Sequence, residues 1–460
     1  MSTRIVILAA GQGKRMYSDL PKVLHPLAGK PLLEHVIHTA LTLAPAVQPL
    51  VIYGHEGEQV QKALGHWNVK WIAQKQQLGT GHALQQALPH LADDEQVLVL
   101  YGDVPLISHE TLKKFIQETP AEALGLMTAY LPDPTGYGRI LRDEDKNLRA
   151  IIEERDADDY LRGIKEVNTG IYYVSASHLK KWLPLLSKHN AQGEYYLTDI
   201  IPMALAENIN ICTIQPSCIE EILGVNDRQQ LNTLERYYQE NLALKLMRQG
   251  VTLYDPKRLD VRGELLVGRD VIIDVNVVME GRVEIGDYCV IGPHVYLRNA
   301  QIGKAVEIRA HSMIDGADIA DGCVVGPFAR LRPGTVLAPQ AHIGNFVEIK
   351  NSFIGEASKA SHLTYIGDAE VGKRVNIGAG TITCNYDGVN KNKTIIGDGA
   401  SVGAGTQLVA PVTVGVGAYI GAGSTITKDA PAQQLTLARS KQLTLEGWRS
   451  PKQKKEKEQV

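Results

Sequence analysis

The residues best suited to chemistry in the first half of the chain form a loop of small and basic side chains. From Leu8 to Arg15 the sequence reads LAAGQGKR. Small residues let a phosphate approach the backbone amides closely, and Arg15 places positive charge beside them. The loop lacks both the GK[ST] ending of a P-loop and the third glycine of the dinucleotide fingerprint. It indicates either a phosphate-binding turn of another kind or an ordinary turn between a strand and a helix.

Further groups that could act on phosphates lie in separate loops. Lys22 follows in the Pro-marked segment DLPKVL, from which its ammonium could reach a transferring phosphate. Asp103 comes directly after an apolar run, and Mg²⁺ usually takes one or two carboxylates and leaves its other positions to substrate phosphates and water. Asn226 has an amide oxygen that could complete such a site. The alternative for Asp103 is a helix-capping or turn aspartate.

Other polar residues in Gly-rich turns are suited to a base or a sugar. Gln74 and the turn at Gly79 and Thr80 can bond to the edge of a base. Three more positions could orient sugar hydroxyls and an amide: Gly138, Glu153 and Asn168. Each of these alone is also compatible with plain loop chemistry.

The second half of the chain carries a different polar cluster. It comprises polar residues within the segments 330–334 and 361–365, among them Arg332, His362 and Tyr365, together with Asn345, Glu348, Lys350, Asn376, Asn385 and Tyr386. The regular pattern around these residues does not need them for a core, so we interpret them as functional. Among the 14 histidines, His362 is the candidate base because it lies between Lys350 and Asn376 in this cluster, whereas His342 occupies an ordinary repeat position. A histidine can accept a proton near neutral pH.

The elements that must position this cluster repeat at a step of six. Aliphatic side chains recur at six-residue intervals from Ile319 to Ile349, and the same step extends from Val267 to Leu297 and from Ile396 to Ile426. This period fits neither a helix nor an alternating strand. It predicts a parallel β-helix of hexapeptides, in which one aliphatic side chain per repeat points inward.

Irregularities in the repeat are also predicted. Four steps are five residues long: 297 to 302, 314 to 319, 349 to 354 and 366 to 371. The polar segment from Cys384 to Thr394 has no aliphatic residue at the expected place, so we expect it to leave the stack as a loop.

The first half alternates strand-like and helix-like segments. Residues 4–8, 50–53 and 96–101 are continuous apolar runs suited to buried strands, and residues 32–43 have helical apolar spacing. This is typical of an α/β fold, in which ligands gather at the carboxyl ends of the strands. We expect an α/β domain over residues 1–226, a linker helix over 227–250, and a β-helix with a charged C-terminal tail over 251–460.

Bulk properties exclude several classes of protein. The net charge of −3 over 460 residues gives no general attraction to nucleic acid or to membrane phosphates. The five cysteines show no CxxC spacing, which favours reduced thiols in a cytoplasmic protein over a disulfide framework or a zinc site. The apolar run near the N-terminus is too short for a signal peptide or a membrane span, so no membrane insertion is expected.

The motifs together resemble one family. The segments LAAGQGKRM, DLPKVL, QLGTGHA, YGDVPL, GYGRI, VNTGIY, GEYYLTDI and GVNDR, followed by hexapeptides, are similar to the bifunctional bacterial N-acetylglucosamine-1-phosphate uridyltransferases and glucosamine-1-phosphate N-acetyltransferases. The resemblance covers all but about the last dozen residues. It implies a Rossmann-like nucleotidyltransferase domain followed by a left-handed parallel β-helix.

For the first domain, the resemblance implies uridylyl transfer from UTP to N-acetylglucosamine 1-phosphate with release of pyrophosphate. Arg15 and Lys22 would stabilise phosphates, and Asp103 and Asn226 would hold Mg²⁺. The implied nucleotide-sugar site comprises Leu8, Ala9, Ala10, Gly11, Lys22, Gln74, Gly79, Thr80, Tyr101, Gly102, Asp103, Gly138, Glu153, Asn168 and Asn226. Lys14 is a departure, since the family has threonine before the loop arginine.

For the second domain, the resemblance implies acetyl transfer from acetyl-CoA to glucosamine 1-phosphate, with His362 as the base. The implied sugar-phosphate ligands are Arg332, Lys350, Tyr365 and Asn376, and the implied acetyl-CoA ligands are Ala379, Asn385, Tyr386, Ala404, Ala422 and Arg439. Ala404 replaces the serine that is common in the family, which removes a hydroxyl contact.

The family also implies a homotrimer. Two alternatives are compatible with the fold: a single-activity sugar nucleotidyltransferase with a regulatory β-helix, and a catalytically inactive assembly subunit. The first predicts no acetylation of a free amine, and the second predicts loss of the loop glycines or Asp103.

Overall fold

The computed structural model describes residues 2–54 and 57–453, and the chain divides into two compact units, Met1–Leu242 and Ala243–Val460. The division falls within helix α8 (Arg228–Arg248), in the segment where a linker helix is predicted. The end of the charged tail, residues 454–460, lies outside the described residues. Within the described ranges, none of the helices combines the length and apolar character that a membrane crossing requires.

The first unit is built on a mostly parallel sheet with strand order β11-β7-β10-β6-β1-β4-β5. The three predicted strands are present, and β1 pairs in parallel with both β4 and β6. The strands are β1 (Thr3–Ala9), β4 (Leu50–Tyr53), β5 (Lys70–Ala73), β6 (Gln96–Tyr101), β7 (Leu124–Tyr130), β8 (Gly138–Arg142), β9 (Leu148–Ile152), β10 (Glu166–Ser175) and β11 (Ile211–Ile214). Strands β8 and β9 extend the sheet beside β10.

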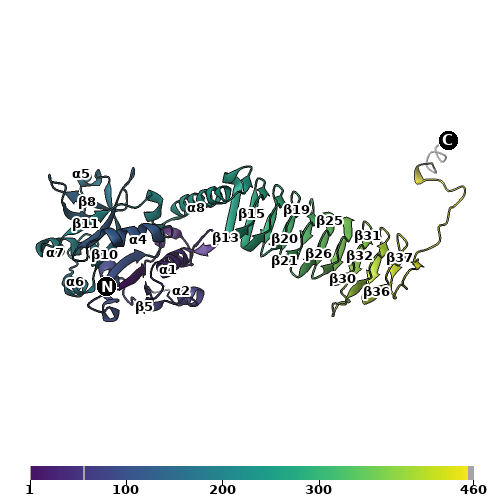
Figure 1. Ribbon diagram of the computed structural model, residues 1–460, viewed down its shortest axis with the longest axis horizontal. Helices are drawn as coiled ribbons and strands as arrows, with labels where there is room; N and C mark the ends of the chain where they lie inside the picture. The colour runs from purple at the N-terminus through teal and green to yellow at the C-terminus, as the bar shows by residue number, and fades with distance from the viewer. Residues whose placement is uncertain (1, 55–56, 454–460) are drawn as a thin grey trace. The chain divides into compact units, whose positions relative to one another are not determined.

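Short helices connect these strands (Figure 1). They are α1 (Leu32–Leu43), α2 (Gly57–Leu64), α3 (Thr80–Gln85), α4 (His109–Glu118), α5 (Asp159–Arg162), α6 (Ala176–Trp182) and α7 (Ile200–Ala206). Helix α1 has the bounds that its apolar spacing predicts. It buries this apolar side against the sheet.

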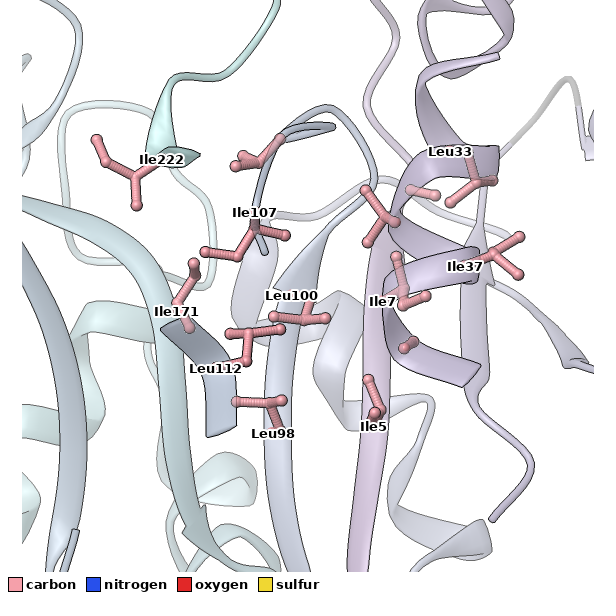
Figure 2. Close-up of a cluster of buried hydrophobic side chains, with 14 of the residues drawn as sticks. Ile5, Ile7, Leu33, Ile37, Leu98, Leu100, Ile107, Leu112, Ile171 and Ile222 are labelled. Atoms are coloured by element: carbon pink, nitrogen blue, oxygen red, sulfur yellow. The ribbon is translucent and has the colours of Figure 1, made fainter. Parts of the chain in front are cut away.

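Side chains on the central strands point alternately to two apolar clusters. Ile5 and Ile7 of β1 pack with Leu33 and Ile37 of α1 in one cluster, as Figure 2 shows. Val6 and Leu8 of β1 belong to the other cluster, which also contains residues of α3 and α6. Because both faces of the sheet are covered, its strands are apolar throughout, which explains the continuous runs in the sequence.

The second unit is a parallel β-helix, which confirms the hexapeptide interpretation (Figure 1). One sheet forms the first face, with strands β12 (Thr252–Leu253), β14 (Ile272–Ile273), β16 (Val290–Ile291), β19 (Glu307–Ile308), β22 (Val324–Val325), β25 (His342–Asn345), β28 (Lys359–His362), β31 (Asn376–Ile377), β34 (Ser401–Val402), β37 (Tyr419–Ile420) and β39 (Leu435–Thr436).

A second sheet folds around the other two faces, because its strands pair between successive turns in two columns. The long strands β13 (Leu259–Val267) and β15 (Val277–Ile285) begin both columns. One column continues through β17 (Tyr296–Arg298), β20 (Met313–Asp315), β23 (Arg330–Leu331), β26 (Glu348–Lys350), β29 (Tyr365–Gly367), β32 (Ile382–Cys384), β35 (Gln407–Val409) and β38 (Thr425–Ile426). The other continues through β18 (Gln301–Ile302), β21 (Ala317–Ile319), β24 (Thr335–Leu337), β27 (Phe353–Ile354), β30 (Ala369–Val371), β33 (Thr394–Ile396) and β36 (Val412–Val414).

The inward side chains are those of the six-residue step. Ile319, Val325, Leu331, Leu337, Ile343 and Ile349 are all at most 3 % exposed. Val267, at the start of the array, is only half-buried. The predicted loop is confirmed as well, because β32 ends at Cys384 and β33 begins at Thr394 while β30 still pairs with β33 in register.

Candidate functional sites

The glycine-rich loop leaves β1 at its carboxyl end and leads into two one-turn 3-10 helices, η1 (Lys14–Met16) and η2 (Lys22–Leu24). Gly13 has a φ of 62°, and a Cβ atom there would lie 2.6 Å from the Cβ of Lys22. Only glycine permits both the backbone conformation and this close approach. The loop therefore packs directly on the stem of Lys22.

The ammonium of Lys22 brings the two predicted metal ligands together. Its Nζ donates to Oδ2 of Asp103 and, over 3.2 Å, to Oδ1 of Asn226. Lys22 is 9 % exposed, so this is a largely buried cation between two oxygens. Two oxygens that share one cation are also the kind of donor set that Mg²⁺ accepts, with substrate oxygens to complete it. Among the described residues no cluster of three or more His, Cys, Asp or Glu side chains could hold a metal alone.

A cleft of about 620 Å³ opens beside this group. Of the residues predicted for the nucleotide, it is lined by Leu8, Ala9, Ala10, Gly11, Lys22, Gln74, Gly79, Thr80, Tyr101 and Asp103. Its wall also includes Arg155, Gln192 and Glu194, which the sequence interpretation missed. Glu194 belongs to the GEYYLTDI motif but was given no role there, whereas Arg155 and Gln192 lie outside the quoted motifs. Gly102 lies against β1, where a Cβ atom would come within 3.0 Å of the Cβ of Ala9.

Gln74 lies at the β5 side of the cleft and is 3 % exposed. Its Nε2 donates to the carbonyl of Gly79 over 3.2 Å and lies 2.9 Å from Nδ1 of His82. These contacts occupy the amide nitrogen, so the amide oxygen remains to accept a hydrogen bond from a ligand.

A second hollow of about 250 Å³ adjoins the cleft. Its lining includes the predicted Arg15, Gly138, Glu153, Asn168 and Asn226, and it shares Thr80, Tyr101 and Asp103 with the cleft. Burial raises the pKa of Glu153, whose carboxylate accepts a hydrogen bond from the Thr198 hydroxyl over 3.1 Å. The first unit thus brings all of its predicted site residues, apart from the packed Gly102, to two connected hollows.

In the second unit, Arg332 and Lys350 lie on successive turns. Arg332 follows β23, and Lys350 ends β26, which pairs with β23. Arg332 forms an ion pair of 2.9 Å with Glu348, and Tyr365 is in register with Glu348 on the next turn. This face therefore presents two cations and a phenol together.

His362 lies at the end of β28, at the corner before β29. The corner residue Leu363 has a φ of 47°, which turns the chain between the two faces. His362 is in register with Asn345 one turn earlier, and its Nδ1 lies 2.8 Å from Oδ1 of Asn345. Because the amide oxygen only accepts, Nδ1 is the donor, and in the neutral ring Nε2 is then the nitrogen with the lone pair. Asn376 lies on the following strand of the same face, paired with Lys359.

Among the predicted acetyl-CoA residues, Ala379, Ala404 and Ala422 form a column on successive turns of the β-helix, whereas Asn385 and Tyr386 lie in a loop. The carbonyls of Ala379, Ala404 and Ala422 accept hydrogen bonds from Gly405 N (2.7 Å), Gly423 N (2.8 Å) and Arg439 Nη1 (2.8 Å), respectively. The column therefore ends at the Arg439 guanidinium.

The loop that leaves the β-helix begins with Asn385 and Tyr386. Asn385 Nδ2 donates to Oδ2 of Asp368, and Asn351 donates to the other carboxylate oxygen over 2.7 Å. Tyr386 is 62 % exposed. The sequence interpretation missed Asp368, although it lies 17 residues after Asn351, which is the length of one turn with a five-residue step.

Comparisons with known proteins agree with this architecture. Residues 5–168 match the family model for a MobA-like NTP transferase domain, residues 261–354 match the GMPPB C-terminal domain, and residues 393–428 match the bacterial transferase hexapeptide model. The chain is therefore a nucleotidyltransferase domain joined to a hexapeptide-repeat domain.

Full-length relatives identify the family. The chain is 56 % identical over 97 % of its length to the bifunctional protein GlmU of Azoarcus sp., of which 99 % is covered. It is 56 % identical over 98 % of its length to that of Aromatoleum aromaticum, and 54 % identical over 98 % to that of Cupriavidus pinatubonensis, with 99 % of each covered. The chain belongs to the bifunctional GlmU family. It is a bifunctional enzyme of UDP-N-acetylglucosamine synthesis, with uridylyltransferase and acetyltransferase activities, and it acts in cell wall synthesis.

Proposed function

We propose that UTP binds in the 620 Å³ cleft and N-acetylglucosamine 1-phosphate in the adjoining hollow. The single observation that carries this assignment is that Thr80, Tyr101 and Asp103 line both the cleft and the hollow. The uridylyl group that is transferred from UTP to the sugar phosphate would therefore move past these three residues. The sugar phosphate oxygen attacks the α-phosphorus of UTP, the bond to the bridging oxygen breaks, and pyrophosphate leaves. Catalysis then depends mainly on positioning and on neutralising charge.

Each predicted site residue is assigned to the part of the substrates that lies nearest to it. The uracil meets Gln74, Gly79 and Thr80 at one end of the cleft, and the acetylated sugar meets Gly138, Glu153 and Asn168 in the hollow. Arg15 and Lys22 hold the phosphates between these ends. Their positive charge lies where negative charge accumulates as pyrophosphate departs.

Mg²⁺ fits the same group of residues. Asp103 and Asn226 would hold it, since their oxygens already share the Lys22 ammonium. When bound, the metal would neutralise phosphate charge. Lys22 remains close enough to neutralise a phosphate oxygen as a point charge.

For acetyl transfer, His362 Nε2 is proposed as the base for the amine of glucosamine 1-phosphate. The amine nitrogen attacks the thioester carbonyl of acetyl-CoA, the C–S bond breaks and CoA leaves as a thiolate, while the amine proton passes to His362. Arg332, Lys350, Tyr365 and Asn376 bind the sugar phosphate. The acetyl-CoA ligands are Ala379, Asn385, Tyr386, Ala404, Ala422 and Arg439. The hydrogen bond to Asn345 supports this role because it selects the neutral tautomer with its hydrogen on Nδ1, in which Nε2 is the basic nitrogen.

A cytoplasmic location and a homotrimeric assembly are also proposed. The five cysteines are all free, which supports a reducing compartment, the cytoplasm. A closed homotrimer suits a β-helix whose polar residues lie on its outer faces. Sedimentation of the purified chain at several concentrations would test the trimer, and a monomer throughout would contradict it.

Two matched variants test the two sites in one polypeptide. Lys22→Met should abolish pyrophosphate release with UTP, Mg²⁺ and N-acetylglucosamine 1-phosphate, but leave CoA release with glucosamine 1-phosphate and acetyl-CoA unchanged. His362→Ala should do the reverse. Asp103→Asn should lose the Mg²⁺-dependent uridylyl transfer. If either of the first two variants retained the activity assigned to its own site, that site assignment would be wrong.

A further inference from the structure

The two loops that carry Arg15 and Lys22 are each too short to hold themselves in place. Helices η1 and η2 contain three residues each. A single 3-10 turn has few internal hydrogen bonds, so its position depends on contacts with other segments. One such contact is apolar: Met16 is buried with Leu27 and Leu234. Further polar contacts come from the start of α8.

Arg228, the first residue of α8, contacts both loops. Its Nε donates to the carbonyl of Met16 over 3.3 Å, and its Nη1 lies 3.2 Å from Nδ1 of His25. Met16 directly follows Arg15, and His25 closes the 3-10 turn that begins at Lys22, through a backbone hydrogen bond of 3.2 Å from its N to the Lys22 carbonyl. The Arg228 guanidinium thus connects the residue that follows Arg15 with the end of the 3-10 turn that begins at Lys22.

The protonation of His25 suits this contact. Burial and the Arg228 charge lower the pKa of His25, although a backbone hydrogen bond opposes them, and the residue is only 2 % exposed. A neutral imidazole has one nitrogen that accepts, so Nδ1 can receive the hydrogen bond from the guanidinium. A charged ring could only donate and would repel Arg228.

The same segment also places the proposed metal ligand. Asn226 precedes Arg228 by two residues, and its backbone N donates to Oε1 of Gln230 over 2.7 Å. Gln230 in turn bonds through its backbone N to Asp227 over 2.8 Å. The residues that begin α8 therefore fix Asn226 directly and the loops of Arg15 and Lys22 through Arg228.

We propose that Arg228 is a positioning residue for uridylyl transfer, which acts by bridging the Met16 carbonyl and His25 so that Arg15 and Lys22 face the phosphates correctly. The proposal rests on the functions proposed above for Arg15 and Lys22. Arg228 is exposed as a whole residue. An exposed arginine without such a role usually tolerates substitution, so the proposal predicts a specific loss.

Arg228→Met tests the bridge because methionine keeps a long stem but has no donor. We expect the uridylyl-transfer kcat to fall about tenfold or more, since small misplacements of catalytic groups are costly, whereas the KM for UTP changes much less. The rate of acetyl transfer by the same preparation should stay constant. Arg248→Met, an exposed arginine in the last turn of the same helix, is the matched control and should leave both rates unchanged.

Arg228→Lys tests whether the positive charge of Arg228 is sufficient or whether its guanidinium must contact Met16 and His25 at the same time. A single ammonium cannot reproduce the fork of the guanidinium, so this variant should stay closer to Arg228→Met than to the unmodified protein. Full activity of Arg228→Lys would overturn the bridge, as would an unchanged kcat in Arg228→Met. Lys22→Met is measured in parallel: if it keeps full activity, the proposed role of Lys22 fails, whereas an inactive Lys22→Met beside a fully active Arg228→Met refutes only the role of Arg228.

Discussion

The contact between Asn345 and His362 gives a prediction whose size follows from the geometry. Asn345→Ala removes the acceptor that lies 2.8 Å from Nδ1 of His362. A neutral hydrogen bond contributes about 0.5–1.5 kcal/mol net, and about 1.4 kcal/mol corresponds to a tenfold change in rate. If the bond serves to select the tautomer and orient the ring, the kcat of acetyl transfer should fall about 2- to 13-fold. Loss of the base itself in His362→Ala should cost about 10²- to 10⁴-fold.

CoA release with glucosamine 1-phosphate and saturating acetyl-CoA measures this effect, and the uridylyl-transfer rate of the same sample is the internal control. Asn345→Asp keeps an oxygen acceptor and should retain most of the rate. In the double variant Asn345→Ala/His362→Ala, the asparagine change should have no further effect, because its action passes through the ring. The reasoning fails if Asn345→Ala leaves kcat unchanged, or if it still slows a chain that lacks His362.

Three further predictions concern the loop, the charge network and the core. Asp368→Ala removes the carboxylate that accepts from Asn385, and a charge-assisted bond of about 1.5 kcal/mol implies a rise of about tenfold in the KM for acetyl-CoA, measurable by CoA release. Burial alone would raise the pKa of Glu166, but the hydrogen bonds and charge of Arg142 lower it below its usual value of 4.5. The contribution of this pair to stability is thus present above that pH and lost as the pH falls below it. Arg142→Met should therefore flatten the pH dependence of unfolding of the first unit below pH 4.5, measured by denaturant unfolding at a series of pH values. Ile343→Ala, at a fully buried position, should destabilise the β-helix by about 2–5 kcal/mol in denaturant unfolding, and a loss below 1 kcal/mol would show that the core tolerates cavities there.

The sequence predicts the β-helix well because one physical rule produces both the pattern and the fold. Each turn needs an inward apolar side chain per hexapeptide, so the period of six is visible without any tertiary information. Thr383 marks the limit of this rule. It stands at an inward position and is 2 % exposed, but it is polar and interrupts the pattern. Its hydroxyl is satisfied by the backbone of Gly367 on the previous turn, accepting from N over 2.7 Å and donating to O over 3.1 Å.

For the first unit, the sequence predicts the core strands better than the contacts within the site. Apolar runs predict β1, β4 and β6 because buried parallel strands need apolar side chains on both faces. The rule that ligands gather at the carboxyl ends of strands also brings Lys22, Asp103 and Asn226 into one candidate set. That the Lys22 ammonium lies between the other two depends on packing between segments 81 and 204 residues apart, which no local pattern encodes.

The two units therefore differ in how their functional partners can be found. In the stacked unit, positions one turn apart share a face, so Asn345 and His362, 17 residues apart, are partners that the turn length itself predicts. In the α/β unit the chain returns to its site through connections of unequal length, and Arg228 reaches Met16 and His25 across more than 200 residues. Arg228 lies in the GVNDR motif, but that motif does not say which residues Arg228 touches, so its role follows only from the contacts it makes.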